Sequence, residues 1–199
     1  MKNNISTDTF HTKKMREFRD KNRCHWCNLG NPLYVEYHDK EWGVPVHDER
    51  KLFEMLLLEG FQAGLSWECV LNKREAFREE FDDFNYEKIA QYDDNRIELL
   101  ISAPDIIRHK LKIKAAKTNA IIFMKIQQEY GSFDQYIWHF TEGKIIYENH
   151  RTTSPLSDSI SKDLKKRGMK FVGSTIIYSY LQAIGIINSH EEGCFLYHS

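Results

Sequence analysis

Apolar residues recur along most of this chain at the three- and four-residue spacing of helix faces, and strand-like alternation is almost absent. Sheets need side chains that alternate with a period of two, so the pattern predicts an all-α fold. With 199 residues, the chain is long enough for one well-packed domain. We therefore expect a single helical domain over residues 23–199, with two closely packed helical lobes as the alternative.

Capping and turn residues divide this pattern into successive helices. Asp48, Ser66 and Ser132 can cap helix starts, Gly131 can stop a long helix, and Gly60 and Gly64 interrupt the apolar run before Ser66. Residues 141–155 are polar and turn-like. The predicted helices cover residues 49–58, 67–81, 86–91, 95–102, 107–130, 132–140, 156–167 and 174–184.

The opening residues differ in composition from the rest of the chain. Residues 1–23 carry seven Lys or Arg against three acids and have no apolar segment, so they do not read as a secretory signal peptide. Residues 1–22 are predicted to be a flexible basic tail. The long uncharged run at residues 171–187 is too short and too polar for a membrane span and predicts a buried helix. We expect a monomer in the cytoplasm.

Charge and cysteine content exclude other classes. The net charge of −1 does not by itself indicate a nucleic-acid-binding protein, although a local basic patch could still bind nucleic acid. Four cysteines are too few for a disulfide scaffold of this size. Together with nine histidines, they indicate a reducing compartment and a candidate metal site.

The cysteines and histidines gather at both ends of the chain. Cys24, Cys27 and His38 stand near the start, and His190 and Cys194 stand near the end. Tetrahedral zinc takes four thiolate or imidazole ligands, and a cluster drawn from both ends would join them. Spacing alone favours Cys24 with Cys27 as the upstream pair, because Cys-x2-Cys is the familiar knuckle. The alternative is that these residues are scattered and bind nothing.

Five aromatic residues and one acid form a second candidate site. Glu59 interrupts an apolar run, and a buried carboxylate is costly unless it is paired. Glu59 could cap a helix or meet an arginine. The other interpretation is a pocket for a flat, cationic molecule, because aromatic faces attract cations. The aromatic residues near Glu59 in sequence are Trp26, Tyr34, Tyr37, Trp42 and Trp67.

Two basic stretches could contact phosphate. Residues 162–170 carry five Lys or Arg and one acid, and glycines at 168 and 173 precede a predicted helix. Glycine permits a tight turn, and the amides that begin a helix can bind a phosphate. Residues 108–117 carry five Lys or Arg and no acid, and we interpret them as a solvated helix face.

Taken together, the motifs resemble the DNA-3-methyladenine glycosylase I family over about residues 23–195, in the family's order. The matching strings are Arg23-Cys24-x-Trp26, Pro32-Leu33-Tyr34, Tyr37-His38-Asp39-x-Glu41-Trp42-Gly43-Val44-Pro45, Leu58-Glu59-Gly60-x-Gln62-Ala63-Gly64-Leu65-Ser66-Trp67, Ile106-Ile107-Arg108, Lys165-Lys166-Arg167-Gly168-x-Lys170-Phe171-Val172-Gly173, Gln182-Ala183-x-Gly185 and His190-x3-Cys194.

The resemblance implies a helix-hairpin-helix enzyme that removes 3-methyladenine from alkylated double-stranded DNA, with a structural zinc ion joining the two ends. Its zinc ligands correspond to Cys24, His38, His190 and Cys194, which displaces Cys27. Its base pocket corresponds to Trp26, Tyr34, Tyr37, Trp42, Glu59 and Trp67. Its wedge into the base stack corresponds to Gly64-Leu65, and the hairpin residues Lys170, Gly173 and Ser174 are expected to contact the DNA backbone.

The chemistry of the lesion agrees with this assignment. Methylation at N3 makes adenine cationic and weakens the glycosidic bond, and the enzyme must take the base out of the stack to reach it. Many helix-hairpin-helix glycosylases carry a catalytic aspartate after the helix that follows the hairpin, but residues 187–190 hold none. We expect hydrolysis without a lyase step, with Glu59 as the candidate catalytic residue.

Two alternatives and two departures accompany this expectation. A zinc-joined module could bind modified bases or damaged DNA without cleaving, or the metal could act in catalysis if a coordination position were open. The chain has Ala103-Pro104-Asp105 where the family usually has Asp-Ala-Gly. It also has Ser189 where the family commonly has aspartate, so a polar partner for His190 is expected to be missing.

Overall fold

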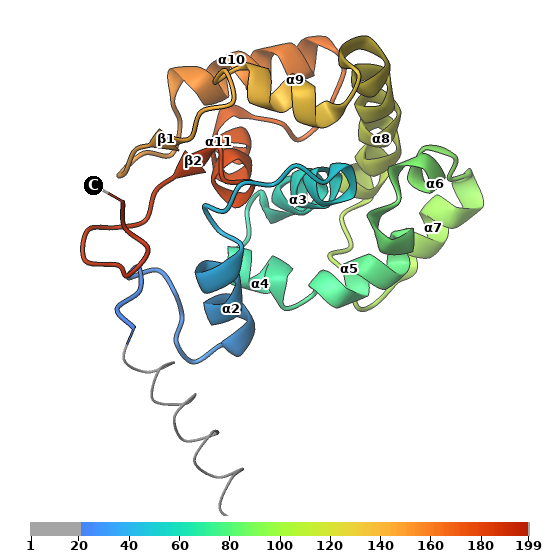
Figure 1. Cartoon of the computed structure of the whole chain (residues 1–199). Helices are drawn as coiled ribbons and strands as arrows, with labels where there is room; N and C mark the ends of the chain where they lie inside the picture. Colours follow the sequence, from blue (N-terminus) through green and yellow to red (C-terminus); the bar gives the residue numbers. More distant parts are fainter. Residues whose placement is uncertain (1–20, 199) are drawn as a thin grey trace, which may run out of the picture.

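The computed structural model describes residues 21–198 (Figure 1), so the predicted tail lies outside the described residues except for Lys21 and Asn22. Within residues 21–198 the regular structure is helical apart from two strands of two residues each, which confirms the predicted all-α class. The elements are α2 (Pro32–Lys40), α3 (Glu49–Gln62), α4 (Trp67–Leu71), α5 (Arg74–Glu80), η1 (Asp82–Phe84), α6 (Tyr86–Ala90), α7 (Asp94–Ser102), α8 (Lys110–Tyr130), α9 (Phe133–His139), β1 (Ile146–Tyr147), α10 (Pro155–Lys166), α11 (Ser174–Ala183) and β2 (Ile187–Asn188).

Helix α3 runs through the middle of the molecule (Figure 1), and all its residues from 52 to 61 are buried. Asp48 caps its first turn as predicted, accepting a hydrogen bond from the Lys51 amide. The predicted end at residue 58 is wrong, because the helix continues through Gly60 to Gln62. Glycine costs a helix about 1 kcal/mol, and packing on all sides of α3 outweighs that cost.

Three other features differ from the sequence prediction: one helix is split, one begins later, and one helix was not predicted. The segment 67–81 forms two helices, α4 and α5, and the break lets Phe77 and Phe81 pack against Phe61. Helix α8 begins at Lys110, after the cap His109, rather than at residue 107. Helix α2 was not predicted, although its Asn31 cap and first-turn proline are recognisable start signals.

The two short strands bring distant segments together. Strands β1 and β2 pair in parallel, with Ile146 opposite Ile187, so the loop after β1 lies beside the C-terminal segment. The C-terminal segment also meets the start of the described chain, because the Phe195 amide donates to the Asn22 carbonyl oxygen at 2.8 Å. The predicted metal ligands at the two ends of the chain are therefore neighbours in space.

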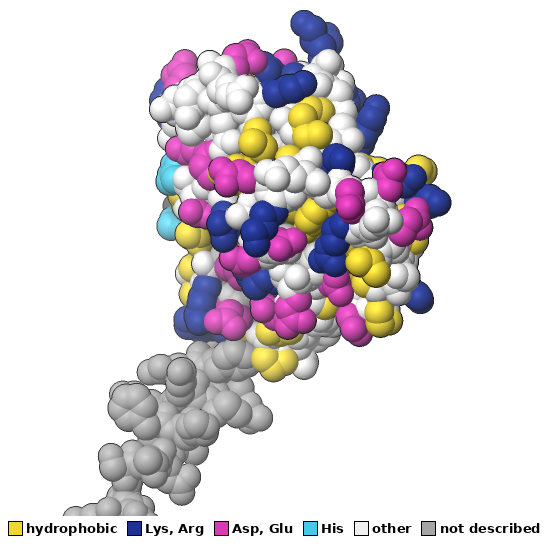
Figure 2. Space-filling view, turned by 90° about the vertical axis from the view of Figure 1, so that its right-hand side faces the viewer, with side chains coloured by type: hydrophobic (Ala, Val, Ile, Leu, Met, Phe, Trp, Pro, Cys, Tyr) yellow, Lys and Arg dark blue, Asp and Glu magenta, His cyan; other side chains and the backbone are white. Residues whose placement is uncertain are grey.

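Nearly all the buried apolar residues of the described chain form one connected core, and the division into one domain or two lobes stays a prediction. On the face of α5 to α7 shown in Figure 2, acidic and basic side chains are interspersed. Several are paired, for example Arg50 with Asp83 and Lys88 with Asp82. This face therefore does not form the continuous basic patch by which many proteins bind DNA.

Within residues 21–198 no helix combines the length and apolar character needed to cross a membrane.

Candidate functional site

The four predicted metal ligands come together in one buried cluster, which we call the Cys/His cluster: Cys24, His38, His190 and Cys194. Their ligand atoms all lie within 4.8 Å of one another. The distances are 3.5 Å from Cys24 Sγ to His190 Nδ1, 3.7 Å from Cys194 Sγ to His190 Nδ1, and 3.6 Å from Cys194 Sγ to His38 Nε2. Tetrahedral zinc with ordinary bond lengths holds sulfur and nitrogen ligands ~3.6 Å apart, so the cluster fits an ion of that size.

Burial also gives the cluster the chemistry of a metal site. Burial raises the pKa of the Cys24 thiol to about 12, so Cys24 needs a neighbouring cation to exist as a thiolate at neutral pH. It lowers the pKa of His190 to about 4, which keeps the imidazole neutral at pH 7. His190 Nε2 donates to the Trp42 carbonyl oxygen at 3.2 Å, which leaves Nδ1 with a lone pair facing the sulfur atoms. The donor set is therefore suited to a metal ion.

Both imidazoles have an outer partner. His38 Nδ1 lies 2.9 Å from the Asp39 carboxylate, which also accepts two hydrogen bonds of 2.7 Å from Arg23. The polar partner of His190, expected to be missing because of Ser189, is the Trp42 carbonyl, so that expectation is wrong. Such partners fix the ring orientation of metal-ligating histidines.

Cys27, which spacing alone favoured as a ligand, is not part of the cluster. Its Sγ lies 3.9 Å from the Tyr34 carbonyl oxygen, and it belongs to no group of candidate metal ligands in the described part of the chain. Helix α2 instead brings His38 back toward Cys24, whose amide nitrogen lies 3.3 Å from His38 Nε2. The Cys-x2-Cys interpretation is therefore wrong for this chain.

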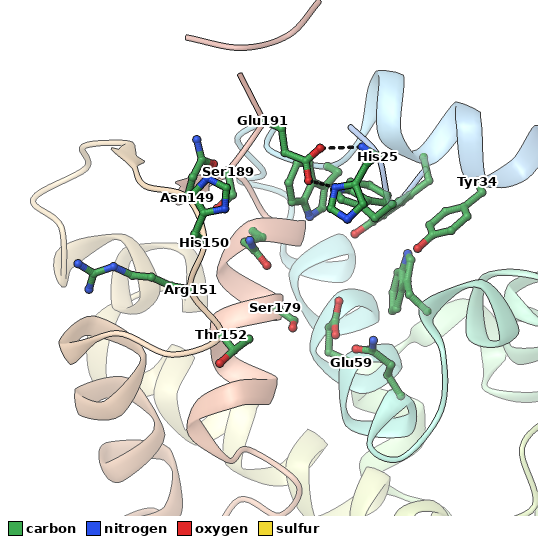
Figure 3. Close-up of a pocket in the computed structure, with 16 residues that line it drawn as sticks. His25, Tyr34, Glu59, Asn149, His150, Arg151, Thr152, Ser179, Ser189 and Glu191 are labelled. Carbon is green, nitrogen blue, oxygen red and sulfur yellow. Dashed lines mark hydrogen bonds and ion pairs between the residues drawn. The ribbon is translucent and has the colours of Figure 1, made fainter. Parts of the chain in front are cut away.

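A cavity of about 390 Å³ opens beside the Cys/His cluster (Figure 3). It is lined by the segment before α2, by α2, α3, α4 and α11, and by the loop that follows β1. All six residues predicted to bind the base line this cavity: Trp26, Tyr34, Tyr37, Trp42, Glu59 and Trp67.

Aromatic rings brace one another along the cavity wall. The ring centroids of Trp26 and Trp42 are 4.7 Å apart at an interplanar angle of 72°, and those of Tyr37 and Trp67 are 5.2 Å apart. Trp42 also makes an edge contact with the imidazole of His190, at 4.7 Å between centroids. The cavity wall and the Cys/His cluster are therefore packed directly against each other, and the flat rings suit a flat ligand.

Glu59 supplies a carboxyl group inside this aromatic wall, with 3% of its surface exposed. Among the described residues, its Oε2 atom and the Trp67 Nε1 atom have no hydrogen-bond partner. The interpretation that Glu59 caps a helix or meets an arginine is therefore wrong. Burial raises the pKa of Glu59 to about 8, so the carboxyl is mostly neutral in the empty cavity at pH 7. A cation in the cavity would lower that pKa and favour the carboxylate.

This raised pKa predicts a pH-dependent effect of Glu59→Gln on stability. The pKa of Glu59 is about 8 in the folded protein and 4.5 in the unfolded chain. The free energy of unfolding of the unsubstituted protein is therefore highest below pH 4.5 and falls as the pH rises to about 8. Glutamine stays neutral throughout. Between pH 5 and pH 9, the free energy of unfolding should shift in favour of the variant by about 4 kcal/mol. Urea unfolding of both proteins at each pH measures this shift, and a pH-independent difference would contradict a buried, unpaired carboxyl.

The residues predicted to contact DNA lie on two turns, of which Gly64 and Leu65 are exposed, as is Lys170, whereas Gly173 and Ser174 are half-buried. Gly64 adopts φ +85°, which favours glycine, and Leu65 beside it is 43% exposed. Gly173 begins α11 without a side-chain cap, so the first amides of α11 have no side-chain acceptor. The Ser174 hydroxyl donates to Asp158 at 2.5 Å, which leaves backbone amides as the donors at this turn. Lys170 is exposed in the same turn.

The cavity has further walls that sequence reasoning missed. The loop of residues 149–152 faces Glu59 and Tyr34 from the other side of the cavity (Figure 3). No periodicity or motif marks this loop. The pairing of β1 with β2 and the hydrogen bond from Asn149 to the His190 carbonyl oxygen bring it here. His25 and Glu191, also lining residues, are hydrogen-bonded to each other at the rim. The remaining lining residues are Gln62, Ser179, Gln182 and Ser189.

Comparisons with known proteins agree with this geometry. The family model described as methyladenine glycosylase matches residues 26–197. The DNA-3-methyladenine glycosylase 1 of Escherichia coli (strain K12) is 46% identical over 182 residues, covering 88% of this chain and 96% of the relative. The DNA-3-methyladenine glycosylase of Haemophilus influenzae is 39% identical over 178 residues, covering 86% and 96%.

Solved structures show the same fold. A crystal structure of a 3-methyladenine DNA glycosylase I has a TM-score of 0.85 at 45% identity and covers 89% of this chain and 100% of its own. The Staphylococcus aureus enzyme, solved for the structural basis of 3-methyladenine recognition, has a TM-score of 0.83 at 36% identity, with the same coverage. The chain therefore belongs to the methyladenine glycosylase family and is a glycosylase enzyme.

Proposed function

We propose that this enzyme acts in base-excision repair and hydrolyses the N-glycosidic bond of 3-methyladenine in alkylated DNA. The relatives carry this activity in their names, and a variant of one similar protein, 37% identical with a TM-score of 0.81, was solved in complex with 3-methyladenine. The observation in this chain that supports the proposal most is the unpartnered Glu59 carboxyl among aromatic rings.

The cavity suits the methylated base better than adenine. In DNA, 3-methyladenine carries a positive charge, which the faces of Trp67 and Tyr37 attract and which a Glu59 carboxylate offsets. Unmodified adenine is neutral, so it would leave the Glu59 carboxyl without a charged partner. The methylated base is also a far better leaving group, because it departs neutral. Selective binding of the cation and the weaker glycosidic bond therefore both favour removal of 3-methyladenine over removal of adenine.

The lining of the cavity supports hydrolysis without a lyase step. A lyase step needs an amine that forms a Schiff base with the sugar, and the described residues that line the cavity include no lysine. The carboxyl groups in the lining are those of Glu59 and Glu191, and Glu191 is engaged with His25 at the rim. This supports Glu59 as the carboxyl group that meets the base.

The Cys/His cluster is proposed to hold one structural zinc ion. Two thiolates and two imidazoles complete a tetrahedral shell, so no coordination position stays open for a water or a substrate. This supports a role in joining the ends of the chain and bracing Trp42 rather than a role in the reaction.

The two turns that carry Leu65 and Gly173 are proposed to hold the DNA. Leu65, exposed and next to glycine, would fill the gap that the flipped base leaves in the stack. The amides at the start of α11 would bind a backbone phosphate near Gly173 and Lys170. The enzyme is proposed to act as a monomer on double-stranded DNA.

One experiment tests the proposed activity directly. Duplex DNA treated with a methylating agent is incubated with the full chain, and the released bases are identified by chromatography. We expect release of 3-methyladenine and a duplex that holds abasic sites but no strand breaks. An untreated duplex serves as the control. Binding without any base release would contradict the enzyme and favour a non-catalytic module, whereas strand cleavage would contradict the absence of a lyase step.

A further inference from the structure

Helix α8 lies behind both turns that are proposed to hold the DNA. We call residues 63–66, between α3 and α4, the wedge loop, and residues 167–173, between α10 and α11, the hairpin. We propose that Lys112 of α8 is a positioning residue that holds the wedge loop for base flipping. This inference rests on the proposed wedge role of Leu65.

Lys112 is buried, with 6% of its surface exposed, although it lies in a basic stretch that we interpreted as a solvated helix face. That interpretation is wrong at this position. Its Nζ donates to the carbonyl oxygens of Phe61 at 2.9 Å and Ala63 at 2.7 Å. These carbonyls stand at the C-terminal end of α3, where the helix dipole favours a positive charge and the carbonyls lack helical partners.

The chain leaves the helix at this attachment. Ala63 has φ −47° and ψ 112°, and Gly64 follows with φ +85°. Nothing lies within 4 Å of the position that a Cβ would take on Gly64, so the tip of the loop is open. Lys112 therefore holds the backbone just before the exposed Leu65. Without the ammonium group, two carbonyls at this end would lose their donor.

The same helix also holds the hairpin. Asn119, about two turns after Lys112, accepts from the Lys170 amide and donates to the Lys170 carbonyl oxygen, each at 2.9 Å. The Lys112 Nζ itself lies 5.9 Å from the ring centroid of Phe171. One rigid helix therefore sets the separation between the wedge loop and the hairpin. Flipping needs that separation, because the wedge must enter the stack while a phosphate is held.

Lys117 offers a matched control. It lies on α8 and its Nζ donates to one backbone carbonyl oxygen, that of Tyr92, at 2.6 Å. Tyr92 follows α6 and belongs to neither the wedge loop nor the hairpin. Lys117→Met therefore removes a lysine with the same kind of contact from the same helix without touching the DNA-holding turns.

The test compares affinities for an intact duplex, for a duplex with a tetrahydrofuran abasic site, and for free 3-methyladenine. Leu65→Ala is expected to weaken binding to the abasic duplex more than to the intact duplex. The abasic preference is the Kd for the intact duplex divided by the Kd for the abasic duplex. Lys112→Met is expected to reduce this ratio by about tenfold and to change the Kd for the free base by less than about twofold. Lys117→Met should change neither quantity. A merely structural role of Lys112 would not move the ratio of the two duplex affinities.

The double variant Leu65→Ala/Lys112→Met decides whether Lys112 acts through the wedge. We expect it to show no loss of abasic preference beyond that of Leu65→Ala, because the two changes remove one function. Additive losses, or an unchanged preference in Lys112→Met when Leu65→Ala reduces it, would overturn the inference about Lys112. An unchanged preference in Leu65→Ala would instead overturn the wedge itself. If Lys112→Met does not fold, Lys112→Gln is measured instead; its shorter, neutral side chain lacks the charge and the reach of Nζ, so the same loss of preference for the abasic duplex is expected.

Discussion

Cys194→Ser is expected to abolish binding of the proposed zinc ion and to lower the free energy of unfolding by about 5 kcal/mol or more, since binding to a structural zinc site contributes directly to folding. Cys194 and Cys24 lie 170 residues apart in sequence, and their sulfur atoms both lie within 3.7 Å of His190 Nδ1. Losing the ion would leave the two segments joined only by hydrogen bonds and by ring contacts such as those of His38 and Trp42 with His190. Metal analysis by plasma mass spectrometry and thermal unfolding measure the two effects.

Cys27→Ser is the matched control for this prediction. Cys27 is buried near Cys24, but its Sγ faces the Tyr34 carbonyl oxygen rather than the cluster. The variant should keep one metal ion per chain and nearly all the stability. Loss of the metal in Cys27→Ser together with its retention in His38→Ala would show that the ligand set is wrong and that the Cys-x2-Cys pair binds instead.

Glu59→Gln is expected to raise KM for release of 3-methyladenine from DNA by about 10- to 100-fold, which corresponds to a charge-assisted contact of roughly 1.5–3 kcal/mol in the bound ground state, without lowering kcat. Glutamine keeps the shape of the side chain but cannot become an anion beside the cationic base. As the glycosidic bond breaks, the positive charge leaves the base for the sugar. The carboxylate therefore favours the bound ground state most, and the loss should appear mainly in KM.

Steady-state kinetics on a duplex with a single lesion separates the two parameters. Glu68→Gln serves as the control, because Glu68 lies on α4 and accepts from Asn28 and Asn31 without lining the cavity. It should leave both parameters unchanged. If Glu59→Gln lowered kcat and left KM unchanged, selection of the base by its charge would be the wrong role, and a role in positioning water would replace it.

Local sequence determined the helices whose ends carry strong signals. Ser132 begins α9 and Gly131 follows the last residue of α8, as predicted, because a capping hydroxyl and a glycine with φ +89° satisfy the helix ends without help from other elements. The all-α class also followed from local spacing, since a period near 3.6 cannot place one apolar face on a strand.

Tertiary packing decided the boundaries where local signals were weak or misleading. Gly60 marks a helix end by its propensity, yet it lies inside α3, where a Cβ would stand 3.6 Å from Phe171. Lys112 belongs to a basic stretch typical of a solvated face, yet it is buried against the end of α3. In both cases the partners are about fifty or more residues away, beyond the reach of any local pattern.

The site divides in the same way. Resemblance to the family's motifs identified the ligand set that includes His38, whereas spacing alone chose Cys27, because neighbours in sequence need not be neighbours across a helix. The acid within an apolar run predicted that Glu59 is buried. Only the tertiary structure decided that no arginine among residues 21–198 meets this carboxyl and that residues 149–152 close the cavity opposite it. The pKa of a buried carboxyl and the wall of a cavity both depend on which groups lie nearby in space. Around Glu59 those groups come from segments about ninety to one hundred and thirty residues away in sequence. The pairing of β1 with β2 and the packing of α11 on α3 bring these segments together.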